Sequence, residues 1–140
     1  MFQLDPSNPF HARVADQLKN EVVGWLTTVG ANGVPQPNLV WFLWDGSDSI
    51  LIYSQDNHKV RNITGSGGVS FNLNSNDTGS DMIVLTGTAA IDTSQPAINE
   101  NAAYIEKYAS GIKEFGSDPA QIAADYHVPI VVTITKLRGF

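Results

Sequence analysis

The fold is decided by the stretch "VVGWLTTVGANGVPQPNLVWFLWDGSDSILIYS", which runs from Val22 to Ser54. Three runs within it have the β-branched, aromatic and aliphatic composition typical of strands: Val22–Val29, Asn38–Trp44 and Ile50–Ser54. Between them, "GANGVPQP" and "DGSDS" carry the Gly, Asn, Asp and Pro residues that favour turns. The pattern predicts a meander of antiparallel strands. The middle run is apolar almost throughout, so we expect it to be buried on both faces.

Outside this stretch, the residue pattern predicts further strands and several helices. Strands are expected at 68–74, at 81–92 with a bulge or bend at Gly87, and after His127. Helices are expected at 9–21 with Asn8 as N-cap, near 57–64, at 95–116 after a Ser94 cap, and at 119–126. The order predicts a single domain, residues 1–140, of α+β class, with about six strands in an antiparallel barrel or sandwich.

Composition excludes several classes of function. The chain has 140 residues, a formal net charge of −6 and no cysteine. An acidic protein is poorly suited to nucleic acid or an anionic membrane as its main partner. Thiolate ligands are excluded, and the three histidines show no metal-binding spacing. With no signal-peptide pattern and no apolar run near the ~20 residues of a membrane span, we expect a cytoplasmic protein without a metal site.

Two cations lie just after the third apolar run, in "SQDNHKVRNITG" (residues 54–65). Lys59 and Arg61 are the only Lys or Arg residues between positions 19 and 107. If a helix begins near His58, its free backbone N–H groups and both cations could bind a phosphate, with Ser54 or His58 donating further hydrogen bonds. The alternative is that both cations are solvated surface residues paired with Asp56. The residues alone leave both interpretations open.

No catalytic motif is visible, since the chain lacks a nucleophile elbow, a glycine-rich nucleotide motif and a defensible triad or carboxylate pair. An enzyme of this kind would need a bound cofactor for its chemistry. Strand aromatics could border a planar cofactor, or they could form the core or an interface. Trp41 and Trp44 are three residues apart and cannot share a face of one regular strand. We expect one of them to lie outside the barrel core, or in a subunit interface.

The order of these segments resembles a known family. The stretch "GWLTTVGANGVPQPNLVWFLWDGSDSILIYSQDNHKVRNITGSGGVSFNLN" and the last strand "VPIVVTITKLRGF" are similar to the pyridoxamine-phosphate-oxidase-like split-barrel flavoproteins. The similarity is greatest to their short branch of factor 420 (F420, a deazaflavin)-dependent oxidoreductases. It implies a six-stranded antiparallel split β-barrel with flanking helices, an FMN-binding split barrel. It also implies a homodimer with cofactor sites at the subunit interface.

The resemblance further implies a site for F420 or FMN. Lys59 matches the family's phosphate-binding basic position, Arg61 matches a frequent second one, and Ser54 lies at the strand end that faces the phosphate. The strand beside the cofactor ring is matched by Asn38, Val40 and Trp41, and the position where the helix packing starts is matched by Asn62. The resemblance implies that all of these are cofactor-binding residues. Family members often carry a basic residue and a proline after the helix. This chain has "TGSGGVSF" there, so both FMN and F420 remain candidate cofactors.

The function implied by the resemblance is hydride transfer between the bound cofactor and a small conjugated substrate, with no catalytic side chain assigned. Because no general acid is recognisable, the alternative is a non-catalytic protein that binds or stores flavin, deazaflavin or a tetrapyrrole. A barrel that has lost its cofactor and serves as an interaction module is a third interpretation.

Overall fold

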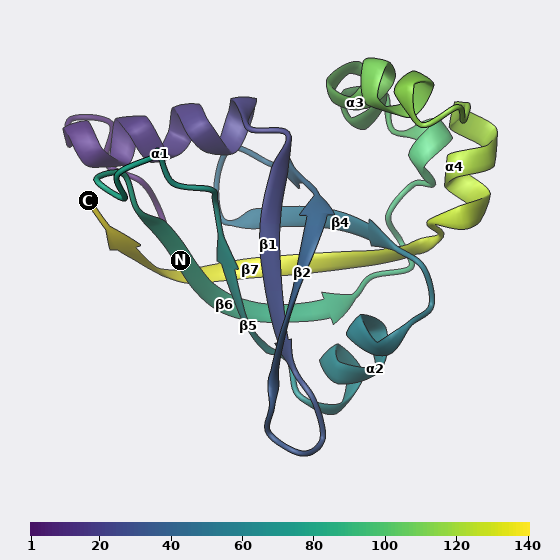
Figure 1. Ribbon diagram of the computed structural model, residues 1–140, viewed down its shortest axis with the longest axis horizontal. Helices are drawn as coiled ribbons and strands as arrows, with labels where there is room; N and C mark the ends of the chain where they lie inside the picture. The colour runs from purple at the N-terminus through teal and green to yellow at the C-terminus, as the bar shows by residue number, and fades with distance from the viewer.

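A curled antiparallel sheet forms the body of the computed structural model, which describes residues 1–140 (Figure 1). Its seven strands follow the order β2-β1-β5-β6-β7-β4-β3. They are β1 (Val23–Val29), β2 (Pro35–Trp41), β3 (Leu43–Trp44), β4 (Ser49–Ser54), β5 (Gly68–Asn72), β6 (Ile83–Ile91) and β7 (Val128–Gly139). This architecture confirms the expected α+β split barrel, although a two-residue strand brings the count to seven rather than six.

Helices flank the sheet at its two ends and below it (Figure 1). They are α1 (Pro9–Asn20), α2 (His58–Gly65), the 3₁₀ turn η1 (Ile98–Glu100), α3 (Ala102–Glu114) and α4 (Pro119–Asp125). α1 begins as expected, because the Asn8 side chain accepts hydrogen bonds from the N–H groups of Phe10 and His11. None of these helices has the length and apolar character that a membrane crossing requires.

The apolar run Asn38–Trp44 forms two strands rather than one. At Phe42 the chain passes from β2, at one edge of the sheet, to β3, at the other edge, and we call this passage the crossing. β2 pairs with β1, whereas β3 pairs with β4, and β2 and β3 are the two edge strands. The expected meander is therefore wrong, and so is the burial of the whole run, since most of β2 is exposed or half-buried. Phe42 itself is fully buried and packs edge-on against Phe71, with ring centroids 5.0 Å apart.

A buried tyrosine of α3 holds this crossing in place. The Tyr108 hydroxyl accepts a hydrogen bond from the N–H of Phe42 over 2.8 Å. It can donate its own proton to the carbonyl of Val22 (2.7 Å) or of Phe42 (2.8 Å). The Lys107 ammonium also donates to the Phe42 carbonyl over 2.8 Å. These contacts satisfy backbone groups that leave the hydrogen-bond ladder of the sheet at the crossing.

We expect Tyr108→Phe to lower the free energy of unfolding by about 1–3 kcal/mol, because it leaves the N–H of a fully buried residue without an acceptor. Denaturant unfolding followed by circular dichroism measures this change. Tyr104→Phe is the matched control on the same helix, since no protein group bonds its hydroxyl, and we expect a change of at most about 0.5 kcal/mol. Equal losses in the two variants would contradict the role assigned to the Tyr108 hydroxyl.

Apolar clusters form on both faces of the sheet. The larger fills the barrel and includes Ile52 and Phe71. The smaller lies under α3 and α4 and includes Tyr108. Trp44 packs against the first cluster and Trp41 against the second, which confirms that one of the two tryptophans lies outside the barrel core.

The helix expected at 95–116 is wrong in its first turns. Ser94 does not cap it, because its hydroxyl donates a hydrogen bond to the Asp92 carboxylate over 2.6 Å. The chain first makes the short turn η1, and α3 then begins behind Asn101, whose side chain accepts from the N–H of Tyr104. The expected irregularity at Gly87 is confirmed, since the pairing of β6 with β7 shifts register there.

Candidate functional site

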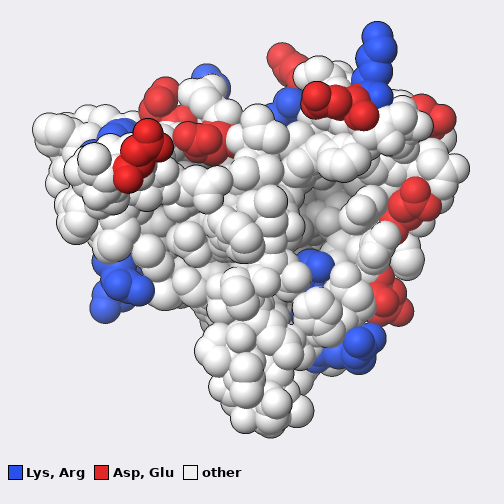
Figure 2. Space-filling view, viewed as in Figure 1, with Lys and Arg blue, Asp and Glu red and all other residues white.

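A pocket opens between the outer face of the sheet and the α3–α4 segment. Its volume is about 430 Å³, and ten of its sixteen lining residues are hydrophobic. Both properties are typical of small-molecule sites. Figure 2 shows the surface hollowed beneath the helical segment, with blue Lys or Arg atoms at the lower margin of the hollow. The lining comes from β1, β2, β4, the start of α2, η1, α3 and α4 with the loop between them.

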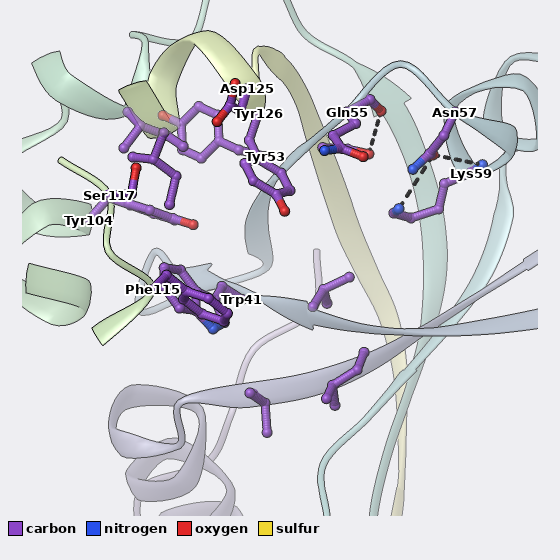
Figure 3. Close-up of a pocket in the computed structure, with 16 residues that line it drawn as sticks. Trp41, Tyr53, Gln55, Asn57, Lys59, Tyr104, Phe115, Ser117, Asp125 and Tyr126 are labelled. Carbon is purple, nitrogen blue, oxygen red and sulfur yellow. Dashed lines mark hydrogen bonds between the residues drawn. The ribbon is translucent and has the colours of Figure 1, made fainter. Parts of the chain in front are cut away.

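Lys59 is the only Lys or Arg residue in the lining. Its side chain is 8% exposed, and its Nζ lies 3.4 Å from the Oδ1 of Asn57 (Figure 3). The ion pair of the structure joins two other residues, so the interpretation of Lys59 as a solvated partner of Asp56 is wrong. Burial lowers the pKa of the Lys59 ammonium below its usual value. Lys59 thus presents an unpaired, partly desolvated positive charge to the pocket.

The start of α2 supplies less positive potential than expected. The helix does begin at His58, but its N-cap Asn57 accepts a side-chain hydrogen bond from the N–H of Lys59 over 3.2 Å. The Asn57 carbonyl accepts from the N–H groups of Val60 (3.1 Å) and Arg61 (3.3 Å). Most N–H groups of the first turn are therefore used within the helix, and the Lys59 ammonium is the main attraction for an anion.

Ser54, Val40 and Trp41 line the pocket with Lys59, as the resemblance implies. The buried Ser54 hydroxyl donates to the carbonyl of Gln55 over 2.7 Å, so its proton is already engaged. The Trp41 ring stacks on Tyr108, with centroids 4.5 Å apart and an interplanar angle of 7°. This contact fixes one aromatic wall of the pocket. A direct bond from any of these residues to a cofactor stays a prediction.

Arg61, Asn38 and Asn62 do not line the pocket of a single chain. Arg61 is exposed on α2, while the Oδ1 of Asn38 lies 3.2 Å from the Nε2 of His58. The Asn62 amide donates to the Oε1 of Gln36 (2.7 Å) and to the hydroxyl of Thr28 (3.0 Å). Asn62 therefore connects α2 to the β1–β2 hairpin, and the cofactor contact expected of it stays a prediction.

The helical wall of the pocket was not found from the sequence. Tyr104, Phe115 and Tyr126 project from it, and Asp125 is the only acidic residue in the lining (Figure 3). One signal was present, since Tyr104 and Tyr108 are four residues apart and share a face of a helix. That spacing predicts a buried face, but it cannot say which ring borders a cavity.

These features define a split-barrel protein: a curled sheet whose two edges are joined at Phe42, and a pocket covered by helices. A family model described as pyridoxamine 5′-phosphate oxidase matches residues 10–139. The chain belongs to this family. A search of curated proteins finds no match.

Solved structures of the same fold have differing described roles. An F420 reductase is 25% identical with a TM-score of 0.65, and the match covers 88% of this chain and 94% of that one. The conserved hypothetical protein Rv2991 of Mycobacterium tuberculosis is 23% identical with a TM-score of 0.69, covering 91% and 81%. HutZ, a heme storage protein of Vibrio cholerae, is 14% identical with a TM-score of 0.62, covering 91% and 92%. The last two similarities concern the fold alone.

Proposed function

We propose that this protein is an oxidoreductase that binds F420 or FMN, with the cofactor phosphate on Lys59 and the ring along the Val40–Trp41 end of β2. The observation that carries the proposal is Lys59, a residue that is 8% exposed and lines a mostly apolar pocket without a carboxylate partner. A desolvated cation without a counter-charge is unfavourable for the protein alone and favourable for an anionic ligand. Membership of the family and the similarity to an F420 reductase support the same assignment.

The residues present fit such a cofactor. Lys59 offers a charge for phosphate oxygens, and aromatic side chains offer flat apolar surface to a conjugated ring. Gly111 lets α3 approach the Trp41 ring, because a Cβ at that position would lie 3.0 Å from two ring atoms. When bound, a flavin or deazaflavin would supply hydride chemistry that no side chain here can perform. The chain itself binds the phosphate, orients the ring and excludes water.

We also propose that the protein acts as a homodimer. Val22, Val34 and Leu39 are exposed on and beside the β1–β2 hairpin, and Leu39 lines the pocket as well. The lower part of Figure 2, where this hairpin lies, shows almost no charged atoms. Uncharged surface with exposed aliphatic residues suits an interface with a second copy, which would then cover the open side of the pocket. Sedimentation equilibrium, which should give twice the chain mass, tests this.

The cofactor assignment predicts saturable binding of F420 or FMN in the micromolar range or tighter. Absorbance and fluorescence titrations of the purified protein with each cofactor separately measure it. Riboflavin, which has the flavin ring but no phosphate, is the matched control, and we expect it to bind at least about tenfold more weakly. Equal binding of riboflavin and FMN, with no binding of F420, would contradict a phosphate site at Lys59.

A storage or sensing role for the same pocket is the second candidate. Two observations favour it: the Ser54 and Tyr53 hydroxyls are engaged in internal hydrogen bonds, and none of the three histidines lines the pocket as an acid or base. Steady-state reduction of conjugated acceptors by the cofactor-loaded protein separates the two functions. Turnover with any acceptor supports the oxidoreductase, whereas a tightly bound ring that exchanges no electrons supports the binding protein.

A further inference from the structure

One phenol in the pocket has no partner. Tyr104 is 2% exposed, yet no protein group forms a hydrogen bond with its hydroxyl. Its two tyrosine neighbours differ from it: Tyr53 donates to the carbonyl of Pro96 over 2.6 Å, and Tyr108 bonds backbone groups at the crossing. Figure 3 shows the Tyr104 ring on the helical side of the pocket, with its oxygen directed into the cavity.

The packing around Tyr104 holds this hydroxyl in one place. Its ring meets Tyr53 edge-on, with centroids 5.0 Å apart, and lies 4.8 Å from the ring of Tyr108. The N–H of Tyr104 is fixed by the Asn101 cap. The hydroxyl borders the pocket and has no protein partner, so its hydrogen-bonding capacity is free for a ligand. The pocket therefore offers a positioned hydrogen-bonding group as well as an apolar wall.

The hydroxyl is a donor rather than an anion. Burial, together with the neighbouring tyrosines, raises the pKa of Tyr104 well above its usual value, so the phenol keeps its proton at any physiological pH. Its natural partner is an acceptor oxygen. Asp125 is the only charged residue at this end of the lining, and it disfavours a second anion there. An uncharged carbonyl oxygen fits both constraints.

The shape of this half of the pocket indicates a flat ligand. Trp41, Phe115 and Tyr126 border it, and the Phe115 ring contacts that of Trp41 with centroids 5.5 Å apart. Aromatic walls of this kind favour planar conjugated molecules. We propose that the Tyr104 hydroxyl donates a hydrogen bond to a carbonyl oxygen of a planar conjugated substrate, held between these aromatic residues. The inference rests on the proposed function, in which Lys59 holds the cofactor phosphate at the other end.

The test compares the parent protein with Tyr104→Phe, which removes only the phenolic oxygen and keeps the ring that borders the pocket. Menadione (2-methyl-1,4-naphthoquinone) is the carbonyl probe, and 2-methylnaphthalene is the probe of similar shape without carbonyls. Dissociation constants for both are measured by ligand-observed NMR on protein loaded with oxidised cofactor. We expect Tyr104→Phe to weaken menadione binding about three- to tenfold and to leave 2-methylnaphthalene binding unchanged.

Four outcomes would overturn the inference: no menadione binding to the parent protein, no loss in Tyr104→Phe, an equal loss for both probes, or a loss of cofactor affinity in place of menadione affinity. The last would assign the hydroxyl to the cofactor ring. Failure of the proposed function is detected by a separate measurement, because the parent protein would then bind neither F420 nor FMN. In that case the two probes are compared on the chain as purified, and the first three outcomes apply.

Discussion

Lys59→Ala is expected to weaken binding of F420 or FMN about ten- to hundredfold. A hydrogen bond to a charged group contributes about 1.5–3 kcal/mol, and in this pocket no second cation can replace the one removed. Titration of the variant with the cofactor that the parent protein binds measures the loss. Riboflavin binding should stay the same in both proteins, because it lacks the phosphate that Lys59 is proposed to hold.

Arg61→Ala is the matched control, two residues along the same helix. Arg61 is exposed and does not line the pocket, so we expect less than about a threefold loss of affinity. The Lys59→Ala, Arg61→Ala double variant should behave like the Lys59 single variant. An unchanged affinity in the double variant would remove the phosphate site from this helix. A larger loss from Arg61→Ala than from Lys59→Ala would move that site to the outer face of α2.

Stability provides an independent readout of the same residue. Because burial lowers the pKa of Lys59, the folded protein carries a free-energy cost for keeping this ammonium charged. Lys59→Met keeps the length of the side chain and removes the charge. It should therefore raise the melting temperature of the ligand-free protein while it weakens cofactor binding. Opposite signs of this kind are typical of binding residues held in a desolvated pocket.

Gly87→Ala is expected to lower the free energy of unfolding by about 3 kcal/mol or more, enough to unfold a marginally stable domain. A Cβ at this bulge would overlap the carbonyl oxygen of Thr133 and lie 2.9 Å from its carbonyl carbon. Thr133 cannot easily move away, because it pairs with Ser49 on one side and Thr88 on the other. Thermal unfolding, or the yield of soluble protein where the loss is complete, measures the effect.

Gly68→Ala is the matched control in the neighbouring strand. Gly68 lies in β5 and pairs with Thr88 of β6, close to the bulge, and a Cβ at Gly68 meets no atom within 4 Å. We expect the free energy of unfolding to change by less than about 1 kcal/mol, because the added Cβ has space and alanine restricts the unfolded chain. If both variants are equally unstable, glycine content in general, and not the contact with Thr133, would be the cause.

The local residue pattern was sufficient to predict most strands and the bulge at Gly87. Alternation or β-branched composition between turn residues is a short-range signal, and Gly87 interrupted a strand that was otherwise regular. The crossing at Phe42 left no such signal, because an apolar run reads the same whether it is one buried strand or two edge strands joined by a buried residue. What separates the two cases is the partner of each half, which is a long-range property.

The candidate site, too, could be predicted from the sequence only in part. Lys59 was found because it and Arg61 are the only cations between positions 19 and 107 of an acidic chain, and its position after β4 then placed it at the pocket. Arg61 was grouped with it by proximity in sequence, but side chains two residues apart on a helix point to different faces. The tyrosines of α3 could not be assigned, because their periodicity identifies a buried face without showing which hydroxyl finds a partner there.

The position of β7 sets the order in which this chain can complete its fold. The β3–β4 hairpin is joined to the rest of the sheet only through β7, the last strand in sequence. Before β7 docks, β4 has an open, largely apolar edge that can pair with another chain. Ser54 pairs with Val128 at the start of β7, so the same docking step completes one wall of the pocket. We therefore expect a ligand of this pocket to suppress aggregation during refolding, since it binds only after the vulnerable edge is closed.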